Sequence, residues 1–313
     1  MSRSDVLYRL ADAVQRALPP GPFLALADGL SDVRWRFAER DRRHSSMNLS
    51  MVLGRPIAQD AVEVREVFRH FGRYLAEFLA APRWLGSTLR VEGLEPLQCA
   101  LFDANAASLK GGVIVLTGHI GNWEVGAMAI RQLGWPMTVL ALPHADPKVN
   151  AFFNRKRRHF GIEVIQTGSS AFRQCATALR RGSILGLVGD RDFGGTGIEL
   201  PLFDHRVRMP RGPALLSLLT GSPIVPVVVA REGPWRLRFV LGETIHPPQT
   251  GRRKRSAPPV AWAGEAAPRE DHAHAEAVKN LVAAYVNFLE QGIRTYPTQW
   301  LMLQPFVQEQ ARE

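Results

Sequence analysis

The pattern of apolar and polar positions divides the chain into a helical first part and a second part of alternating short elements. Residues 5–40 predict two amphipathic helices interrupted at the proline-rich 19–22, and residues 59–81 predict a third helix. From residue 112 onward, aliphatic runs suited to buried strands alternate with segments of helical periodicity. This alternation predicts an α/β fold with a central, mostly parallel sheet flanked by helices and an amphipathic helical N-terminal region.

The second part of the chain contains many closely spaced expected elements. Expected strands cover 89–91, 112–117, 137–142, 162–165, 183–189, 223–230 and 235–241. Expected helices cover 98–110, 123–133, 147–160, 169–181, 211–220 and 272–294. We therefore divide the chain into a helical, membrane-facing region at 1–85, an α/β core at 86–246, an insert at 247–272, and a closing helix and tail at 273–313. Proline, alanine, glycine and charged residues dominate the insert, which predicts disorder there.

The charge balance points to an anionic partner. The 313 residues include 39 Lys and Arg against 29 Asp and Glu, a formal charge of +10. A phospholipid surface, a nucleotide-bearing substrate or a nucleic acid fits this charge. The second predicted helix interleaves aromatic side chains with a set of arginines, Arg34, Arg36, Arg40, Arg42 and Arg43. Such a helix suits either the surface of an anionic membrane or packing on the core with a solvated basic edge.

Cysteine usage and hydropathy limit the other classes of protein. Cys99 and Cys175 are the two cysteines and have no metal-ligand neighbours, so we expect no disulfide scaffold and no metal site, and a reducing cytosol. No apolar run approaches the ~18 residues of a membrane span. If the protein meets a membrane, we expect it to lie on the cytoplasmic face as a peripheral protein.

The stretch 112–127 carries the strongest chemical signal. Four aliphatic residues lead into a glycine turn that contains His119, and Asn122 is a good N-cap for a following helix. The turn therefore lies at the carboxyl end of a strand, where ligands collect in α/β sheets. His119 suits general-base chemistry at neutral pH, and Glu124, five residues later, is expected to reach back and orient one ring nitrogen.

Basic and acidic residues elsewhere provide further candidates. Arg157 and Arg158, within a run of four cations at a helix end, suit either the helix dipole or a phosphate or oxyanion. Asp190 and Arg191 follow a strand and open a glycine-rich loop whose amides suit an anion, although these two residues could instead pair with each other. Glu199 is expected to bind substrate hydroxyls, and Arg211 begins a helix where an anion is favoured.

These motifs together resemble the bacterial lysophospholipid acyltransferase superfamily, in the branch of lipid A late acyltransferases and phosphatidylinositol mannoside acyltransferases. The resemblance covers residues 5–245 and 280–305 and rests on several ordered segments. They are 118–124 (GHIGNWE), 189–193 (GDRDF), 197–203 (GIELPLF), 209–213 (MPRGP), 220–226 (TGSPIVP) and the tail with Pro297 and Trp300. The N-terminal region departs from the lipid A enzymes, which usually have a membrane helix there. The 190–192 and 197–199 segments look closer to the mannoside-acylating branch.

The resemblance implies an O-acyltransferase without a cofactor, in which acyl-CoA or acyl-ACP is a co-substrate. His119 would deprotonate a hydroxyl of a glycolipid or lysophospholipid acceptor, and that hydroxyl would attack the acyl thioester. Arg157 or Arg158 would handle the donor or the oxyanion, while Asn122, Asp190, Arg191, Glu199 and Arg211 would contribute to substrate binding. The partners implied are the acyl donor, the lipid acceptor and an anionic membrane surface, and no nucleic acid.

Two other functions compete with this interpretation. An ester or thioester hydrolase would share the sheet and the sharp turn, but the chain has no Gly-x-Ser-x-Gly segment. A binding module for nucleic acid or membrane would use the arginine clusters, 252–255 included, without catalysis.

Overall fold

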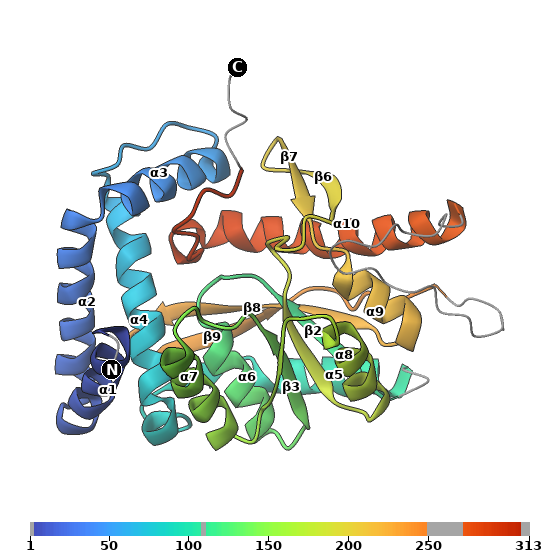
Figure 1. Cartoon of the computed structure of the whole chain (residues 1–313), viewed down its shortest axis with the longest axis horizontal. Coiled ribbons are helices and arrows are strands. Elements are labelled where there is room, and N and C mark those ends of the chain that lie inside the picture. Colours follow the sequence, from blue (N-terminus) through green and yellow to red (C-terminus); the bar gives the residue numbers. More distant parts are fainter. Residues whose placement is uncertain (1–2, 108–110, 249–271, 308–313) are drawn as a thin grey trace.

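The computed structural model describes residues 3–107, 111–248 and 272–307 (Figure 1). The N-terminal part consists of helices: α1 (Arg3–Ala17), α2 (Pro20–Phe37), α3 (Glu39–Leu53) and α4 (Val62–Trp84). Helices α2 and α4 lie side by side along one flank of the molecule (Figure 1). None of the helices in these described ranges is long and apolar enough to cross a bilayer. The predicted insert lies almost entirely outside the described residues, as does the basic cluster 252–255.

The centre of the protein is a seven-stranded sheet in the order β1-β9-β8-β2-β5-β3-β4. Its strands are β1 (Arg90–Glu92), β2 (Val113–Thr117), β3 (Met137–Ala141), β4 (Glu163–Gln166), β5 (Ile184–Val188), β8 (Ile224–Gly233) and β9 (Arg236–Leu241). All neighbouring pairs are parallel except β8 and β9, which form an antiparallel pair. The predicted mostly parallel α/β sheet is therefore confirmed.

Helices cover both faces of this sheet, because the side chains of a central strand alternate between two apolar cores. Along β2, Ile114 and Leu116 pack into one core, and Val113 and Val115 pack into the other. The first core is closed by α8 (Ala171–Arg180), α9 (Gly212–Thr220) and α10 (His272–Thr295). The second is closed by α4, α5 (Leu94–Ala107), α6 (Trp123–Gln132) and α7 (Pro147–His159).

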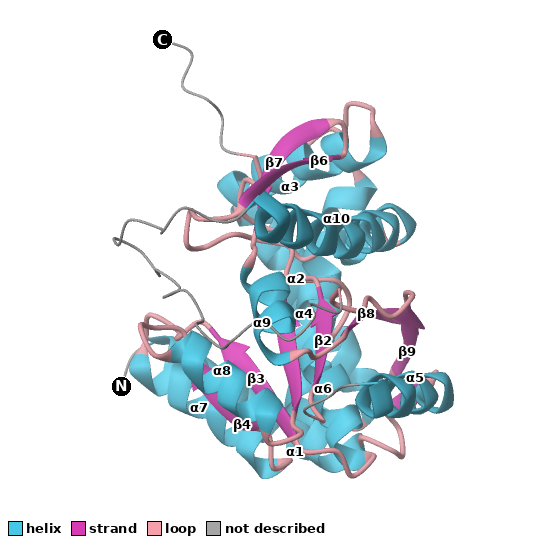
Figure 2. Cartoon of the chain, turned by 90° about the vertical axis from the view of Figure 1, so that its right-hand side faces the viewer, coloured by secondary structure: helices cyan, strands magenta, loops and turns pink. Residues whose placement is uncertain are grey.

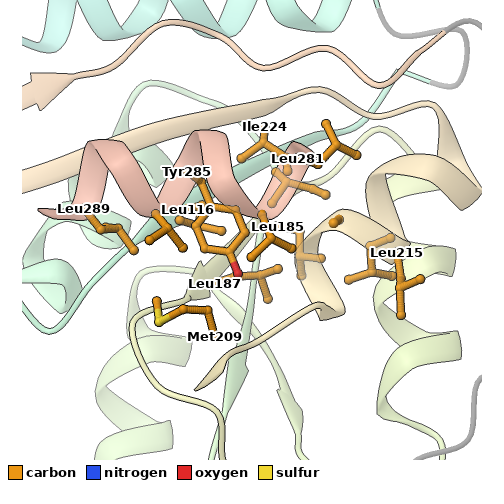
Figure 3. Packing of buried hydrophobic residues seen from close by; sticks show 14 of the residues in the cluster. Leu116, Leu185, Leu187, Met209, Leu215, Ile224, Leu281, Tyr285 and Leu289 are labelled. Carbon is orange, nitrogen blue, oxygen red and sulfur yellow. The ribbon is translucent and has the colours of Figure 1, made fainter. Parts of the chain in front are cut away.

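Helix α10 lies across the sheet and fixes the C-terminal segment. Tyr285 is fully buried, and its ring lies among Leu116, Leu185 and Leu187 of the sheet (Figure 3). Its hydroxyl donates a hydrogen bond to the carbonyl of Pro210. Beyond α10, the short 3₁₀ helix η1 (Pro297–Gln299) leads the chain back to the carboxyl edge of the sheet.

Two elements differ from the predicted pattern. The second predicted helix ends at Phe37. Arg40, Arg42 and Arg43, which we assigned to it, lie in α3, a helix that the sequence did not predict. The buried positions of α3 are mostly polar, and Asn48 among them donates hydrogen bonds to the carbonyls of Met302 and Gln304. Such a helix has no apolar stripe to reveal it.

The second difference is an antiparallel hairpin of β6 (Ile198–Leu202) and β7 (His205–Met209), where we expected a glycine-rich loop. The hairpin lies against α10, on the side of α10 away from the central sheet (Figure 2). Its two turn residues, Phe203 and Asp204, both have positive φ angles, of 51° and 63°. Asparagine or glycine usually signals such a turn, so the sequence lacked its common marker.

Candidate active site

The predicted strand, turn and helix around His119 are confirmed. Strand β2 ends at Thr117, and the side chain of Asn122 caps α6 by accepting a hydrogen bond of 3.2 Å from the amide of Val125. Gly121 has a φ of +64°, and a Cβ there would lie 1.8 Å from the carbonyl oxygen of Val229. Glycine is therefore required for the turn to approach β8.

Asp190, which follows β5, binds both the ring and the backbone of His119. Nδ1 of His119 lies 2.7 Å from Oδ1 of Asp190, and the backbone amide of His119 donates a 2.8 Å hydrogen bond to Oδ2. Oδ2 also accepts a 2.9 Å hydrogen bond from the indole of Trp300. Because Asp190 accepts through its carboxylate, Nδ1 carries the ring proton and Nε2 of the neutral imidazole holds the free lone pair.

The prediction that Glu124 orients His119 is wrong in this structure. Both oxygens of Glu124 bind Arg157, with its Nε at 2.9 Å and Nη2 at 2.5 Å. Arg157 also donates a 2.9 Å hydrogen bond to Oδ1 of Asn154. A carboxylate forms a bidentate pair more readily with a guanidinium than with an imidazole, so Glu124 binds the buried arginine of α7 instead of His119. Glu124 therefore positions Arg157.

The surroundings of His119 make its ring more basic. Burial lowers the pKa of His119, but the charge of Asp190 and its hydrogen bond raise it by more, so the pKa lies above the ordinary value of 6.5. Burial raises the pKa of Asp190, and its contacts with His119 and Trp300 outweigh this and leave the pKa lowered. Asp190 is thus ionised at neutral pH, and it stabilises a proton taken up by His119.

His119 opens onto a cavity of about 480 Å³ with a polar end and an apolar end. At the polar end, His119, Trp123, Glu124 and Arg157 line the wall. Trp123 meets the imidazole edge to face at 4.9 Å between ring centroids. The apolar end lies between α6 and the sheet and is lined by side chains such as Ala127, Ile130, Met137, Val139, Val227 and Phe239.

The remaining predicted site residues do not line this cavity. Arg158 is exposed and binds the carbonyl of Asn154, while Glu199 on β6 pairs with Arg208 at 3.2 Å. Arg191 binds Gln304 rather than Asp190, and its guanidinium lies over the ring of Phe193, which lines the cavity. Arg211 is the N-cap of α9. None of these four is among the residues that line the cavity.

The expected anion nest in the loop after β5 already has an internal partner. The amides of Gly194 and Gly197 donate to the carboxylate of Asp192, at 3.1 and 2.7 Å. This loop thus binds its own acidic side chain. Within the described ranges, no cluster of three or more His, Cys, Asp or Glu residues is arranged to hold a metal ion.

A buried polar network behind the turn was missed by the sequence analysis. Asn122 donates a 2.8 Å hydrogen bond to Glu77 of α4, and Glu77 makes a bidentate ion pair with Arg231 of β8. Gln299 binds both the amide and the carbonyl of Arg231, at 2.7 and 2.8 Å. The one available sequence signal was an acidic residue inside the apolar stretch 74–81 of a helix. The network joins α4, the turn, β8 and the tail into one support for His119.

Comparison with known proteins adds a family to this geometry. The family profile "Bacterial lipid A biosynthesis acyltransferase" matches residues 5–308. A phosphatidylinositol mannoside acyltransferase of Mycolicibacterium smegmatis is 27% identical over 312 residues, covering 96% of this chain and 90% of the relative. A protein of the same name from Mycobacterium tuberculosis H37Rv is 27% identical over 269 residues, covering 82% of this chain and 74% of the relative.

Proposed function

The chain belongs to the bacterial lipid A biosynthesis acyltransferase family and is an acyltransferase. We propose that it moves a fatty acyl group from an acyl thioester to a hydroxyl of a membrane glycolipid, with His119 as general base. The observation that carries the proposal is the 2.7 Å contact between His119 and the buried Asp190 at the polar end of a largely apolar cavity. An acyltransferase of this kind needs an acyl donor and a glycolipid acceptor.

The proposed reaction proceeds without a covalent enzyme intermediate. Nε2 of His119 takes the proton of the acceptor hydroxyl as its oxygen attacks the carbonyl carbon of the thioester. Asp190 stabilises the resulting imidazolium through the Nδ1 proton, as its effect on the pKa of His119 supports. When the tetrahedral intermediate collapses, the C–S bond breaks, and the thiol leaves with the proton held by His119. An ester and a free thiol are the products.

Arg157 is proposed to stabilise the donor side of this reaction. Its guanidinium lines the cavity and is fixed by Glu124 and Asn154, so it loses little freedom when it binds a further oxygen. A fixed N–H donor beside a developing oxyanion lowers the barrier because it needs no reorganisation during the reaction. In this arrangement Glu124 is a positioning residue.

The apolar end of the cavity is the proposed site of the acyl chain. Apolar side chains of α6 and of several strands line it. Each methylene that leaves water for such a site contributes about 0.8 kcal/mol. Two apolar cavity residues, Leu142 and Phe193, are 54% and 59% exposed, which supports entry of a lipid chain from that side.

The acceptor and the acyl carrier are proposals at a finer level. The names of the two mycobacterial relatives favour a mannosylated phosphatidylinositol over a lipid A precursor, and acyl-CoA and acyl-ACP both fit as donors. We further propose that the protein binds the cytoplasmic membrane surface peripherally through α1 and α2. Exposed apolar residues recur along one face of α2, at Leu26, Leu30, Val33 and Phe37, with Phe37 79% exposed.

The test is transfer of a labelled palmitoyl group from coenzyme A or acyl carrier protein to lipids extracted from the source cells. We expect the label in a lipid with the wild-type protein, and a loss of about 10²–10⁴-fold with His119→Ala. His205→Ala removes an exposed histidine of the hairpin and serves as the matched control. Label released as free acid, equally with and without acceptor lipid, would instead establish a hydrolase.

A further inference from the structure

A second cavity, of about 600 Å³, lies between α1, α4 and α7 and shares no lining residue with the cavity of His119. Five cationic side chains line it: Arg9, Arg16, Arg83, Arg155 and Lys156. The proposed reaction uses none of them. Helix α7 separates the two cavities, with Lys156 facing this one and the neighbouring Arg157 facing the catalytic one.

Arg16, Arg83, Arg155 and Lys156 outnumber the carboxylates among the described residues that line this cavity. Asp12 is the one carboxylate among the described residues that line it, and its two oxygens bind Lys156 and Arg16, each at 2.5 Å. Arg83 donates to the carbonyl of Arg16, which leaves further N–H groups of its guanidinium available. Among the described lining residues, positive charge therefore exceeds negative charge even when Arg9 is set aside.

One polar group that lines the cavity lacks a partner among the described residues. Gln15 is only 3% exposed, and its amide nitrogen has no hydrogen-bond partner among the residues that the structure describes. A buried donor without an acceptor is costly to fold, and such groups are rare in proteins. The ring of Phe152 also lines the cavity, and its centroid is 5.8 Å from both the Arg155 guanidinium and the Lys156 ammonium.

We propose that this cavity binds a phosphate group of a ligand, with Gln15, Arg83 and Arg155 as direct contacts. Phosphate fits because its oxygens accept several hydrogen bonds at once and its charge matches the surplus of cations. Two sources present this chemistry: the headgroup of an anionic phospholipid, and the nucleotide of an acyl-CoA, the latter resting on the proposed acyl transfer. Either ligand would join α1 to α7, the helix that carries Arg157.

The experiment measures binding to the full chain by calorimetry and by vesicle sedimentation, without any acyl transfer. The soluble probes are inorganic phosphate and adenosine 3′,5′-bisphosphate. The vesicles consist of phosphatidylcholine with or without phosphatidylinositol. The test variant is R83Q/R155Q, and the matched control is R173Q/R180Q, which removes the same charge from the exposed face of α8.

We expect the test variant to weaken binding by about tenfold or more, since charge-assisted hydrogen bonds are lost, and the control to change it by less than about twofold. A loss confined to the bisphosphate assigns the site to a nucleotide, and a loss confined to vesicles assigns it to a headgroup. Failure of every probe to bind, or an equal loss in both double variants, overturns the proposal and leaves the separate test of His119 unaffected.

Gln15→Leu provides an independent measurement. The leucine removes the unpartnered amide, so we expect a higher midpoint of thermal unfolding in the absence of ligand and weaker binding of the phosphate probe. A lower midpoint together with unchanged binding would show that Gln15 serves packing alone, and would remove it from the proposed site.

Discussion

Asp190 accepts a hydrogen bond from Nδ1 of His119, although 71 residues separate the two along the chain. The parallel register of β2 and β5 explains the contact, because Thr117 lies opposite Val188 at the ends of the two strands, and His119 and Asp190 each follow two residues later. Adjacent parallel strands bring their carboxyl ends to the same edge of the sheet. The dyad is therefore a consequence of strand order.

Asp190→Asn is expected to change both the rate and the pH profile of acyl transfer. His119 acts as a base only when neutral, so activity falls as the pH drops through its pKa, which lies above 6.5 in the wild type. Without the Asp190 carboxylate, the lowering of the His119 pKa by burial is no longer outweighed, so the acidic limb of the kcat/KM profile moves to lower pH. The maximal rate falls by about 10²–10⁴-fold, because the ring loses its orienting partner. Asp192→Asn, in the same loop, should leave the limb in place.

Glu124→Gln tests whether this carboxylate acts on His119 or on Arg157. Among the charges that raise the pKa of His119, that of Glu124 has a smaller effect than that of Asp190. We therefore expect kcat/KM to fall through Arg157 while the acidic limb moves less than in Asp190→Asn. A larger shift for Glu124→Gln would mean that Glu124 is the orienting partner during catalysis. The pH dependence of kcat/KM, measured for both variants, decides the point.

The sequence could predict features that depend on neighbouring residues, but not contacts that depend on the order of strands in the sheet. The aliphatic strand, the glycine turn and the Asn122 cap are local, and all three were predicted correctly. The partner of His119 was not, because Glu124 is close in sequence whereas Asp190 becomes a neighbour only through the crossover that places β5 beside β2. The choice between Arg157 and Arg158 likewise depended on which face of α7 meets the cavity.

The buried ion pair of Glu77 with Arg231 predicts a large loss of stability in Glu77→Ala. The variant leaves the Arg231 side chain, which is 4% exposed, without its carboxylate, and Asn122 loses a partner. Removing one member of a buried pair costs about 3–5 kcal/mol. Glu66→Ala on the same helix removes a 28% exposed carboxylate that binds Arg69 and Arg73, and it should cost about 0–1 kcal/mol. Urea unfolding of both variants measures the difference, and equal losses would contradict the role of the network.

Ala127→Phe is expected to shorten the acyl chain that the enzyme accepts. Ala127 faces the apolar end of the cavity from α6, so the added ring occupies space between α6 and the sheet. Each methylene excluded from the cavity forfeits about 0.8 kcal/mol of binding, so long donors lose most while short donors are nearly unaffected. Ala151→Phe adds the same ring to the exposed face of α7 and should leave the chain-length profile unchanged. The measurement is the ratio of kcat/KM for palmitoyl and butyryl donors in the three proteins. A parallel loss for both donors in Ala127→Phe would indicate damage to folding, whereas an unchanged ratio with full activity would place the acyl chain elsewhere.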